Sequence, residues 1–217
     1  MRTIFTGGIS YIQPVPGGTA QWYYGIDHAN GDLDDAEDLI RAGLKAEGND
    51  LCLIRYPEGE VYHPVPKTPG VYTDTPVFYR GGVCFLCVDF IKKTIRILRF
   101  DCDTAQISEV AALPLESAKN CYNLQLHVSP LCLTRQGNEG VFEILWPERT
   151  AFAISPHEGF FLRDGDTLYF GRWHETGEGE DYRYWEDTVA RDLSGREIKT
   201  MPGDLNLMPN GEVWHLS

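Results

Sequence analysis

One stretch of the sequence mixes aromatic and acidic side chains in a way that suits sugar chemistry. Residues 173–187 read WHETGEGEDYRYWED, with two tryptophans, two tyrosines and six carboxylates. Aromatic faces can stack on pyranose rings, and two carboxylates can serve as general acid and general base. The alternative is a solvated hairpin with tyrosines on a half-buried strand. We favour the hairpin, because no glycosidase motif accompanies the stretch.

A second acidic stretch, residues 27–38 (DHANGDLDDAED), places oxygen-bearing side chains around a glycine, as calcium loops do. The order of an EF-hand is not met, because placing Gly31 sixth puts Ile26 at the first ligand position. Acidic residues are also favoured at helix N-termini by the helix dipole. We therefore interpret this stretch as a turn that leads into a helix, with no metal.

The cysteines and histidines carry no signature of a metal site or a nucleophile. Cys84 and Cys87 have CxxC spacing, but residues three apart on a strand point to opposite faces, and no second pair completes a zinc site. The six histidines are scattered singly. The sequence also has no G-x-S-x-G, no P-loop and no G-x-G-x-x-G. We predict no catalytic residue, no metal and no cofactor.

The elements that would position these residues recur at a regular spacing. Four strands are expected in each of three units, which cover residues 77–112, 124–154 and 159–200. The last strands of these units begin at Ala105, Ala151 and Arg196, and 151 − 105 is 46 while 196 − 151 is 45. A period of about 40–50 residues with four strands per unit is typical of a β-propeller.

The two ends of the chain each supply about two more strands, over residues 3–13 and 205–216. Joined, they would complete one blade and remove exposed strand edges, the 2+2 closure of propellers. The similarity of PEGEVYH at 57–63 to PNGEVWH at 209–215 supports repeat ancestry. We therefore expect an all-β, five-bladed propeller in one domain over residues 1–217, with about 43 residues per blade (217/5).

Residues 164–170 (DGDTLYF) resemble the DGDxIYF-type repeat of several uncharacterised bacterial propeller families. In those families the repeat enters the second strand of a blade. Over residues 50–217 the resemblance consists of one good copy and three degraded ones. It implies a propeller architecture and no particular activity.

One segment, residues 21–51, departs from the strand pattern. Asp34 or Asp35 can cap a helix that runs to about Ala46, and Glu37 lies where a capping box requires it. Gly48 is a natural stop. We expect one short helix, near residues 35–46, inserted into the β-structure.

The first strand of each propeller blade lines the central channel, and ligands usually sit at a channel mouth. Five residues on the expected first strands are our predicted ligand-binding residues: Trp22, Tyr24, Arg80, His127 and Arg163. Two arginines and a histidine could hold a carboxylate or a phosphate in an otherwise acidic protein. The alternative is that each arginine pairs with a neighbouring aspartate.

Charge and hydropathy restrict the partners. A net charge of −13 disfavours nucleic acid and anionic membranes. Residues 1–10 lack the apolar stretch of a secretory signal, and no window approaches the roughly 18 apolar residues of a membrane span. The cysteines fall mostly inside apolar strands, as free thiols do. We expect a cytoplasmic monomer.

We therefore predict a binding or interaction propeller that takes a protein partner, or a small anionic or sugar-like ligand at the channel mouth. We lean towards a protein that is not an enzyme. The alternative is a glycan-active hydrolase with two carboxylates roughly 5–10 Å apart in the central funnel. Its candidates are Asp27, Asp89, Asp166 and Glu175.

Overall fold

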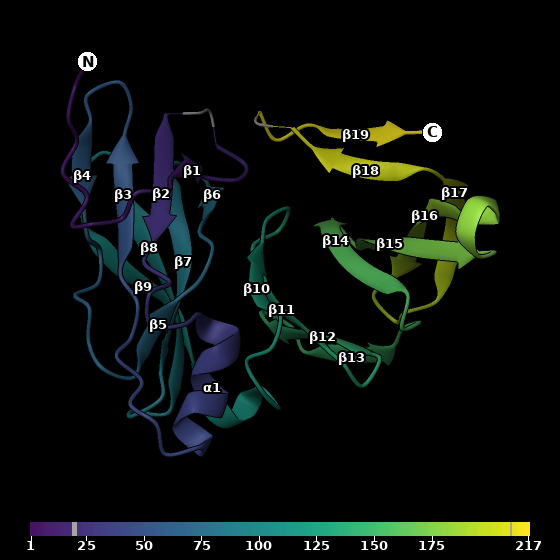
Figure 1. Ribbon diagram of the computed structural model, residues 1–217, viewed down its shortest axis with the longest axis horizontal. Coiled ribbons are helices and arrows are strands. Elements are labelled where there is room, and N and C mark those ends of the chain that lie inside the picture. The colour runs from purple at the N-terminus through teal and green to yellow at the C-terminus, as the bar shows by residue number, and fades with distance from the viewer. Residues whose placement is uncertain (19–20, 209) are drawn as a thin grey trace. The chain divides into compact units, whose positions relative to one another are not determined.

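The computed structural model describes residues 1–18, 21–208 and 210–217. The chain forms two compact units (Figure 1). The first comprises Met1–Leu126 with a short piece of the C-terminal segment, and the second comprises His127–Met208 and Glu212–Ser217. Each unit is built from antiparallel sheets in which strands consecutive in the chain are neighbours. A single domain over residues 1–217 stays a prediction.

The first unit contains two sheets. The first sheet has the order β1-β2-β3-β4, with strands at Gln13–Pro14, Trp22–Ile26, Leu51–Arg55 and Glu60–Tyr62. The second has the order β5-β7-β8-β9, with strands at Val71–Thr73, Gly82–Asp89, Thr94–Asp101 and Ile107–Pro114, and β6 (Val77–Tyr79) also pairs with β7. Every residue of β7 is buried, as in strands covered on both faces. A 3₁₀ turn, η1 (Leu115–Ser117), follows β9.

Aromatic and aliphatic side chains from both sheets form the core of the first unit. Trp22 of β2 packs edge-on against Phe100 of β8, with ring centroids 5.3 Å apart, and Tyr62 of β4 lies 5.1 Å from the same ring. Leu53 and Phe85 are fully buried in this cluster. Burial of such side chains stabilises the unit by roughly 1.5–3 kcal/mol each.

One α-helix, α1 (Leu33–Arg41), lies in the first unit. The Asp32 side chain caps it by accepting the Asp35 N–H at 3.0 Å, and Gly43 follows the helix at φ +69°. The inserted helix is confirmed, but its predicted cap (Asp34 or Asp35) and its predicted extent (35–46) are wrong. Asp32 directly precedes the first helical residue, Leu33, so its carboxylate is the one placed to accept from the first turn. The left-handed backbone at Gly43 ends the helix before Gly48. No helix of the described ranges is long and apolar enough to cross a bilayer.

Two side chains of α1 fasten the helix to the segment between β9 and β10. Asp34 accepts the Asn123 N–H at 3.1 Å, and Glu37 accepts the Cys121 N–H at 3.0 Å. Both acceptors were expected to cap the helix itself. They instead satisfy backbone donors of a loop more than 80 residues later in the sequence, so the helix helps to hold that loop.

Two further sheets have the same up-and-down order. The third is β10-β11-β12-β13, at Leu124–His127, Cys132–Gly137, Val141–Trp146 and Thr150–Ala153. The fourth is β14-β15-β16-β17, at Glu158–Asp164, Thr167–Thr176, Arg183–Asp192 and Glu197–Pro202, with a 3₁₀ turn, η2 (Gly179–Asp181), between β15 and β16. In the second unit, Phe142 packs against Phe160 and Phe170, at 4.6 and 5.2 Å. The predicted all-β class and four-stranded repeat are confirmed.

The expected 2+2 blade is not formed. β18 (Asp204–Leu207) and β19 (Val213–Leu216) pair with each other in a two-stranded sheet, and residues 1–12 form no strand. Ile9 is instead buried against Cys52 and Ile54 of β3, in space that a side chain at Gly25 would fill. The described part of the chain thus has four sheets of four or more strands where five blades were expected. Pro209, the first residue of the repeated PNGEVWH, lies outside the described residues.

Candidate functional site

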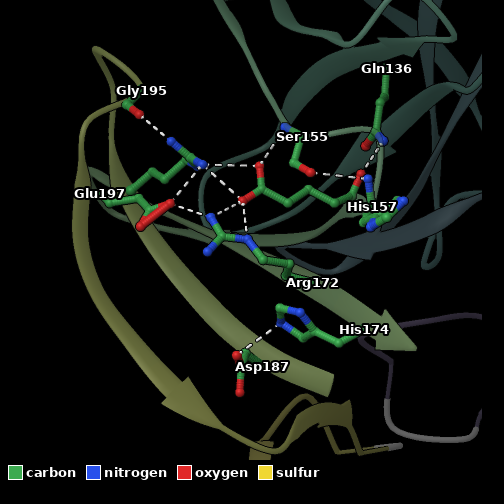
Figure 2. A network of polar contacts seen from close by, with 10 residues as sticks. Gln136, Ser155, His157, Arg172, His174, Asp187, Gly195 and Glu197 are labelled. Atoms are coloured by element: carbon green, nitrogen blue, oxygen red, sulfur yellow. Dashed lines mark hydrogen bonds and ion pairs between the residues drawn. The ribbon is translucent and has the colours of Figure 1, made fainter. Parts of the chain in front are cut away.

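A cluster of polar side chains in the second unit, drawn in Figure 2, surrounds Glu158, the first residue of β14. Its buried carboxylate accepts hydrogen bonds from Arg172 Nε at 2.9 Å and from Arg191 Nη2 at 2.8 Å. The Ser155 N–H donates to the second oxygen at 3.1 Å. Glu197 pairs with both arginines, with Arg191 at 3.1 Å. Two carboxylates and two guanidiniums therefore neutralise one another in this cluster.

The strand register explains why these side chains meet. Glu158 lies opposite Arg172 across β14 and β15, and Arg191 lies opposite Glu197 across β16 and β17. Directly opposed residues of antiparallel strands project from the same face. The cluster thus ties three consecutive strand pairs together on one face of the fourth sheet.

The arginines keep Glu158 ionised. Burial by itself would raise the pKa of this carboxyl group, but the hydrogen bonds from Arg191 and Arg172 outweigh it and lower the pKa. Arg191 also donates from Nη1 to the Gly195 carbonyl at 2.7 Å, and its buried Nε has no hydrogen-bond partner among the described residues. A carboxylate held in this way is a poor proton donor, so the cluster suits structural support better than acid catalysis.

Gln136 joins the cluster to the neighbouring sheet. Its side-chain nitrogen donates to the Glu158 carbonyl at 2.6 Å, and its side-chain oxygen accepts the Phe160 N–H at 2.8 Å. Gln136 belongs to β11, whereas both partners belong to β14. The two sheets of the second unit are therefore linked by a reciprocal pair of hydrogen bonds beside the polar cluster.

A histidine–aspartate pair lies on the same face (Figure 2). His174 Nε2 is 3.0 Å from Asp187 Oδ2, and the imidazole stacks on the Trp185 ring with centroids 5.0 Å apart and planes 8° apart. An aspartate can orient a histidine that activates a nucleophile. Among the described residues, Asp187 is the hydrogen-bond partner of His174 and no hydroxyl or thiol bonds to it. The pair therefore lacks the third member of a catalytic triad.

The ends of β15 and β16 extend beyond their neighbours. Strand β14 pairs with β15 as far as Arg172, and β17 pairs with β16 from Asp187 onward. Residues 173–186, which we call the arm, continue as a two-stranded hairpin. The sequence prediction of a hairpin is confirmed here. Three of its aromatic side chains are about half exposed, Tyr182 at 48%, Tyr184 at 53% and Trp185 at 45%, whereas Trp173 stacks on the His157 ring with centroids 4.0 Å apart.

One side of the arm alternates rings and carboxylates. Trp173 lies opposite Glu186, and Glu175 lies opposite Tyr184, so these four residues share the side that we call the acidic–aromatic face. The Tyr182 hydroxyl donates to Glu175 at 3.1 Å, and the Tyr184 hydroxyl donates to Glu186. The hydrogen bond to Glu186 raises the pKa of Tyr184 to about 12.

Two of the five predicted ligand residues belong to the core of the first unit. Trp22 and Tyr24 are 6% and 4% exposed, and the Tyr24 hydroxyl accepts a hydrogen bond from the Gln13 side chain. Arg80 is exposed in the turn between β6 and β7, at φ +48°, with its guanidinium 5.1 Å from the centre of the Tyr79 ring.

The other two predicted residues lie in the second unit. His127 meets the Phe160 ring edge-on at 4.6 Å, and loss of hydration lowers its pKa to about 4, so the imidazole is neutral near pH 7. Arg163 is buried, donates from Nε to the Gly165 carbonyl at 2.7 Å and has an Asp166 oxygen at 3.9 Å. The partnered Arg163 matches the alternative given above. A ligand shared by the five residues stays a prediction.

The acidic stretch 27–38 has internal partners. Asp27 pairs with Lys67 at 2.6 Å, and Asp32 caps α1. The described ranges contain no group of three or more His, Cys, Asp or Glu side chains arranged to hold a metal. Cys84 and Cys87 are free and buried on β7, and burial raises the pKa of Cys84 to about 11, so its thiol stays protonated.

Sequence reasoning missed Glu158 and its two arginines. The partners lie 14 and 33 residues away from Glu158, and no local motif connects them. The sequence did offer one signal: Glu158 begins a strand, and each of the next two strands carries an arginine, Arg172 on β15 and Arg191 on β16. Reading it requires the strand register, which includes a shift between Phe160 and Leu162.

Comparisons with known proteins give similarity to solved structures alone. No protein-family model matches the chain, and no curated protein matches it. Two solved structures similar to the chain are TolB from Acinetobacter baumannii and the β-propeller domain of the Trilobed protease from Pyrococcus furiosus, described as having an open Velcro topology. Each is 12% identical to the chain, with a TM-score of 0.46.

These alignments cover 95% and 93% of the chain but 45% of the first structure and 60% of the second. The chain thus spans about half the length of the structures it matches. Similarity at this level assigns neither an activity nor a partner to the chain.

Proposed function

We propose that this protein is a binding or interaction protein built from propeller-type blades, and that the arm is its contact surface. The observation that carries the proposal is the exposure of three aromatic side chains, Tyr182, Tyr184 and Trp185, on a hairpin that projects past its sheet. Tyrosine and tryptophan anchors are enriched among the residues that dominate binding energies. Their rings add contact area at a low cost in side-chain entropy.

Two of the four candidate carboxylates of the alternative hydrolase, Asp27 and Asp89, are unsuited to act as its general acid. A general acid needs a raised pKa. The pKa of Asp27 is lowered, mainly by its hydrogen bond to Lys67, and the pKa of Asp89 is lowered as well, because hydrogen bonds from the Lys92 and Ile91 N–H groups outweigh burial. Glu158, the most buried carboxylate near the arm, is held ionised by two arginines.

The five residues predicted from the sequence would form a second, separate site. An anionic ligand beside Arg80, His127 and Arg163 would meet two cations, of which Arg163 already donates to a carbonyl. We keep this site as a proposal that depends on the ring closure of the blades. The arm requires no such closure, because its two strands pair with each other and both belong to the second unit.

Binding to peptide and glycan arrays, with wild type and the double variant Tyr184→Ala/Trp185→Ala, tests the proposal. We expect the double variant to lose at least about tenfold in affinity for any array hit, because central aromatic anchors are worth about 2 kcal/mol or more. Trp214→Ala is the matched control, since Trp214 is 51% exposed on β19 outside the arm.

A parallel assay with nitrophenyl glycosides tests the alternative. We expect no turnover. Hydrolysis that disappears in Glu175→Gln would contradict a binding role, and so would array binding that survives the loss of both arm aromatics.

A further inference from the structure

We propose that the acidic–aromatic face of the arm binds an arginine side chain carried by an extended basic segment of a partner protein. This inference rests on the proposed function, because it names the partner of the same surface. The face consists of the exposed or half-exposed side chains of Trp173, Glu175, Tyr184 and Glu186, with Tyr182 beside them.

The alternation of rings and carboxylates on this face suits a guanidinium. Cross-strand neighbours have Cβ atoms about 4.5–5.5 Å apart, and Glu175 lies directly opposite Tyr184. A guanidinium that stacks on the Tyr184 ring therefore has a carboxylate within reach of its N–H groups. Arginine combines ring stacking with bidentate pairing to carboxylates, which lysine does not.

The two carboxylates are positioned but not saturated. The Tyr182 hydroxyl holds Glu175, and the Tyr184 hydroxyl holds Glu186. A carboxylate can accept about four hydrogen bonds, so each retains acceptor positions for an incoming donor. Prior orientation by the tyrosines reduces the side-chain entropy that binding would otherwise cost.

Charge complementarity identifies the occupant as basic. Residues 173–186 carry five carboxylates and one arginine. That arginine, Arg183, lies opposite Thr176, on the same side of the arm as His174 and Trp185. The acidic–aromatic face therefore has no lysine or arginine of its own among the described residues. Asp204 adds a further negative charge near Tyr184, which strengthens attraction for a cation.

The strand edges of the arm favour an extended partner. Trp173 N–H still bonds to the His157 carbonyl at 3.0 Å. In the described structure, the part of β15 after Trp173 pairs only with β16, and the part of β16 before Glu186 pairs only with β15. The outer edges of both strands are therefore unpaired there. An extended segment could add backbone hydrogen bonds at such an edge while an alternate side chain reaches the face.

Two charge-matched variants test the inference. Glu175→Gln/Glu186→Gln removes both carboxylates of the face, whereas Glu178→Gln/Glu180→Gln removes two exposed carboxylates from the turn of the same arm. Both variants change the net charge by the same amount. Glutamine keeps an oxygen that can accept from each tyrosine hydroxyl, so the first variant should fold, and thermal melting checks this.

The probe is a fluorescein-labelled peptide of alternating arginine and serine, and the readout is fluorescence anisotropy. We expect Glu175→Gln/Glu186→Gln to weaken binding at least about tenfold and Glu178→Gln/Glu180→Gln less than about twofold. The same peptide with citrulline in place of arginine, which is neutral, should not bind.

Three outcomes would overturn the inference. Equal losses in the two variants would show attraction by net charge without a site. Array binding that depends on Tyr184, without binding of the arginine peptide, would refute the basic partner and leave the proposed function standing. Absence of any arm-dependent binding, on the arrays and with the peptide, would refute both.

Discussion

His127, at the end of β10, makes the folding free energy depend on pH. Its partly buried ring packs edge-on against Phe160 at 4.6 Å, and loss of hydration lowers its pKa from 6.5 to about 4. The folded protein therefore keeps the imidazole neutral where the unfolded chain already binds a proton. The stability associated with the neutral ring is complete above pH 6.5 and is lost as the pH falls towards 4.

The size of the effect follows from the two pKa values. At pH 5, proton binding by the unfolded chain favours unfolding by about 2 kcal/mol, and the limit at low pH is about 3 kcal/mol. For a chain of 217 residues, 2 kcal/mol corresponds to a melting temperature lower by about 4–8 °C.

Urea unfolding of wild type and His127→Phe at pH 8 and pH 5 measures this contribution. We expect the wild type to lose about 2 kcal/mol more than the variant between the two pH values, because phenylalanine keeps the aromatic packing and cannot bind a proton. His215→Gln is the control, since His215 is exposed on β19. The reasoning is refuted if His127→Phe shows the same pH difference as wild type.

Two further predictions concern charged side chains. Glu158→Gln should destabilise the protein by about 2 kcal/mol in urea unfolding, because it leaves the partly buried guanidiniums of Arg172 and Arg191 with Glu197 as the carboxylate that still pairs with both. Glu180→Gln, in the exposed turn, should change stability little. The pKa of Glu158 is lowered, so its contribution should be lost as the pH falls below 4.5. Asp32→Ala should lower the free energy of unfolding by about 1 kcal/mol in the same assay, because it removes the cap of α1. Asp38→Ala, which breaks an exposed ion pair, should lower it by a few tenths of a kcal/mol at most. An equal effect of the two substitutions would show that the cap contributes nothing.

The repeat of four strands could be predicted because it depends on local patterning. Strand β8 alternates between buried and partly exposed residues, and the turn at Gly140 has a positive φ that glycine readily adopts. Helix α1 could be predicted in kind but not in position. The run DLDD at residues 32–35 offers three carboxylates as caps, and tertiary contacts of Asp34 decide between them.

The parts that could not be predicted depend on contacts between distant segments. The N-terminal segment could have paired with the C-terminal strands or packed on the first sheet, and the fit of Ile9 over Gly25 is visible only in three dimensions. The Glu158 cluster depends on the register of four strands in the same way. The acidic–aromatic face depends on the register of β15 against β16, which places Trp173 opposite Glu186. The sequence of the hairpin alone did not specify this register.

The most direct test of the arm as a contact surface is site-specific photocrosslinking. The photoreactive residue p-benzoylphenylalanine in place of Tyr184 should crosslink to the arginine–serine peptide. The same residue in place of Ile198, which is 56% exposed on β17 outside the arm, should give no crosslink above background. Equal crosslinking at both positions, or crosslinking at 198 alone, would contradict binding through the arm.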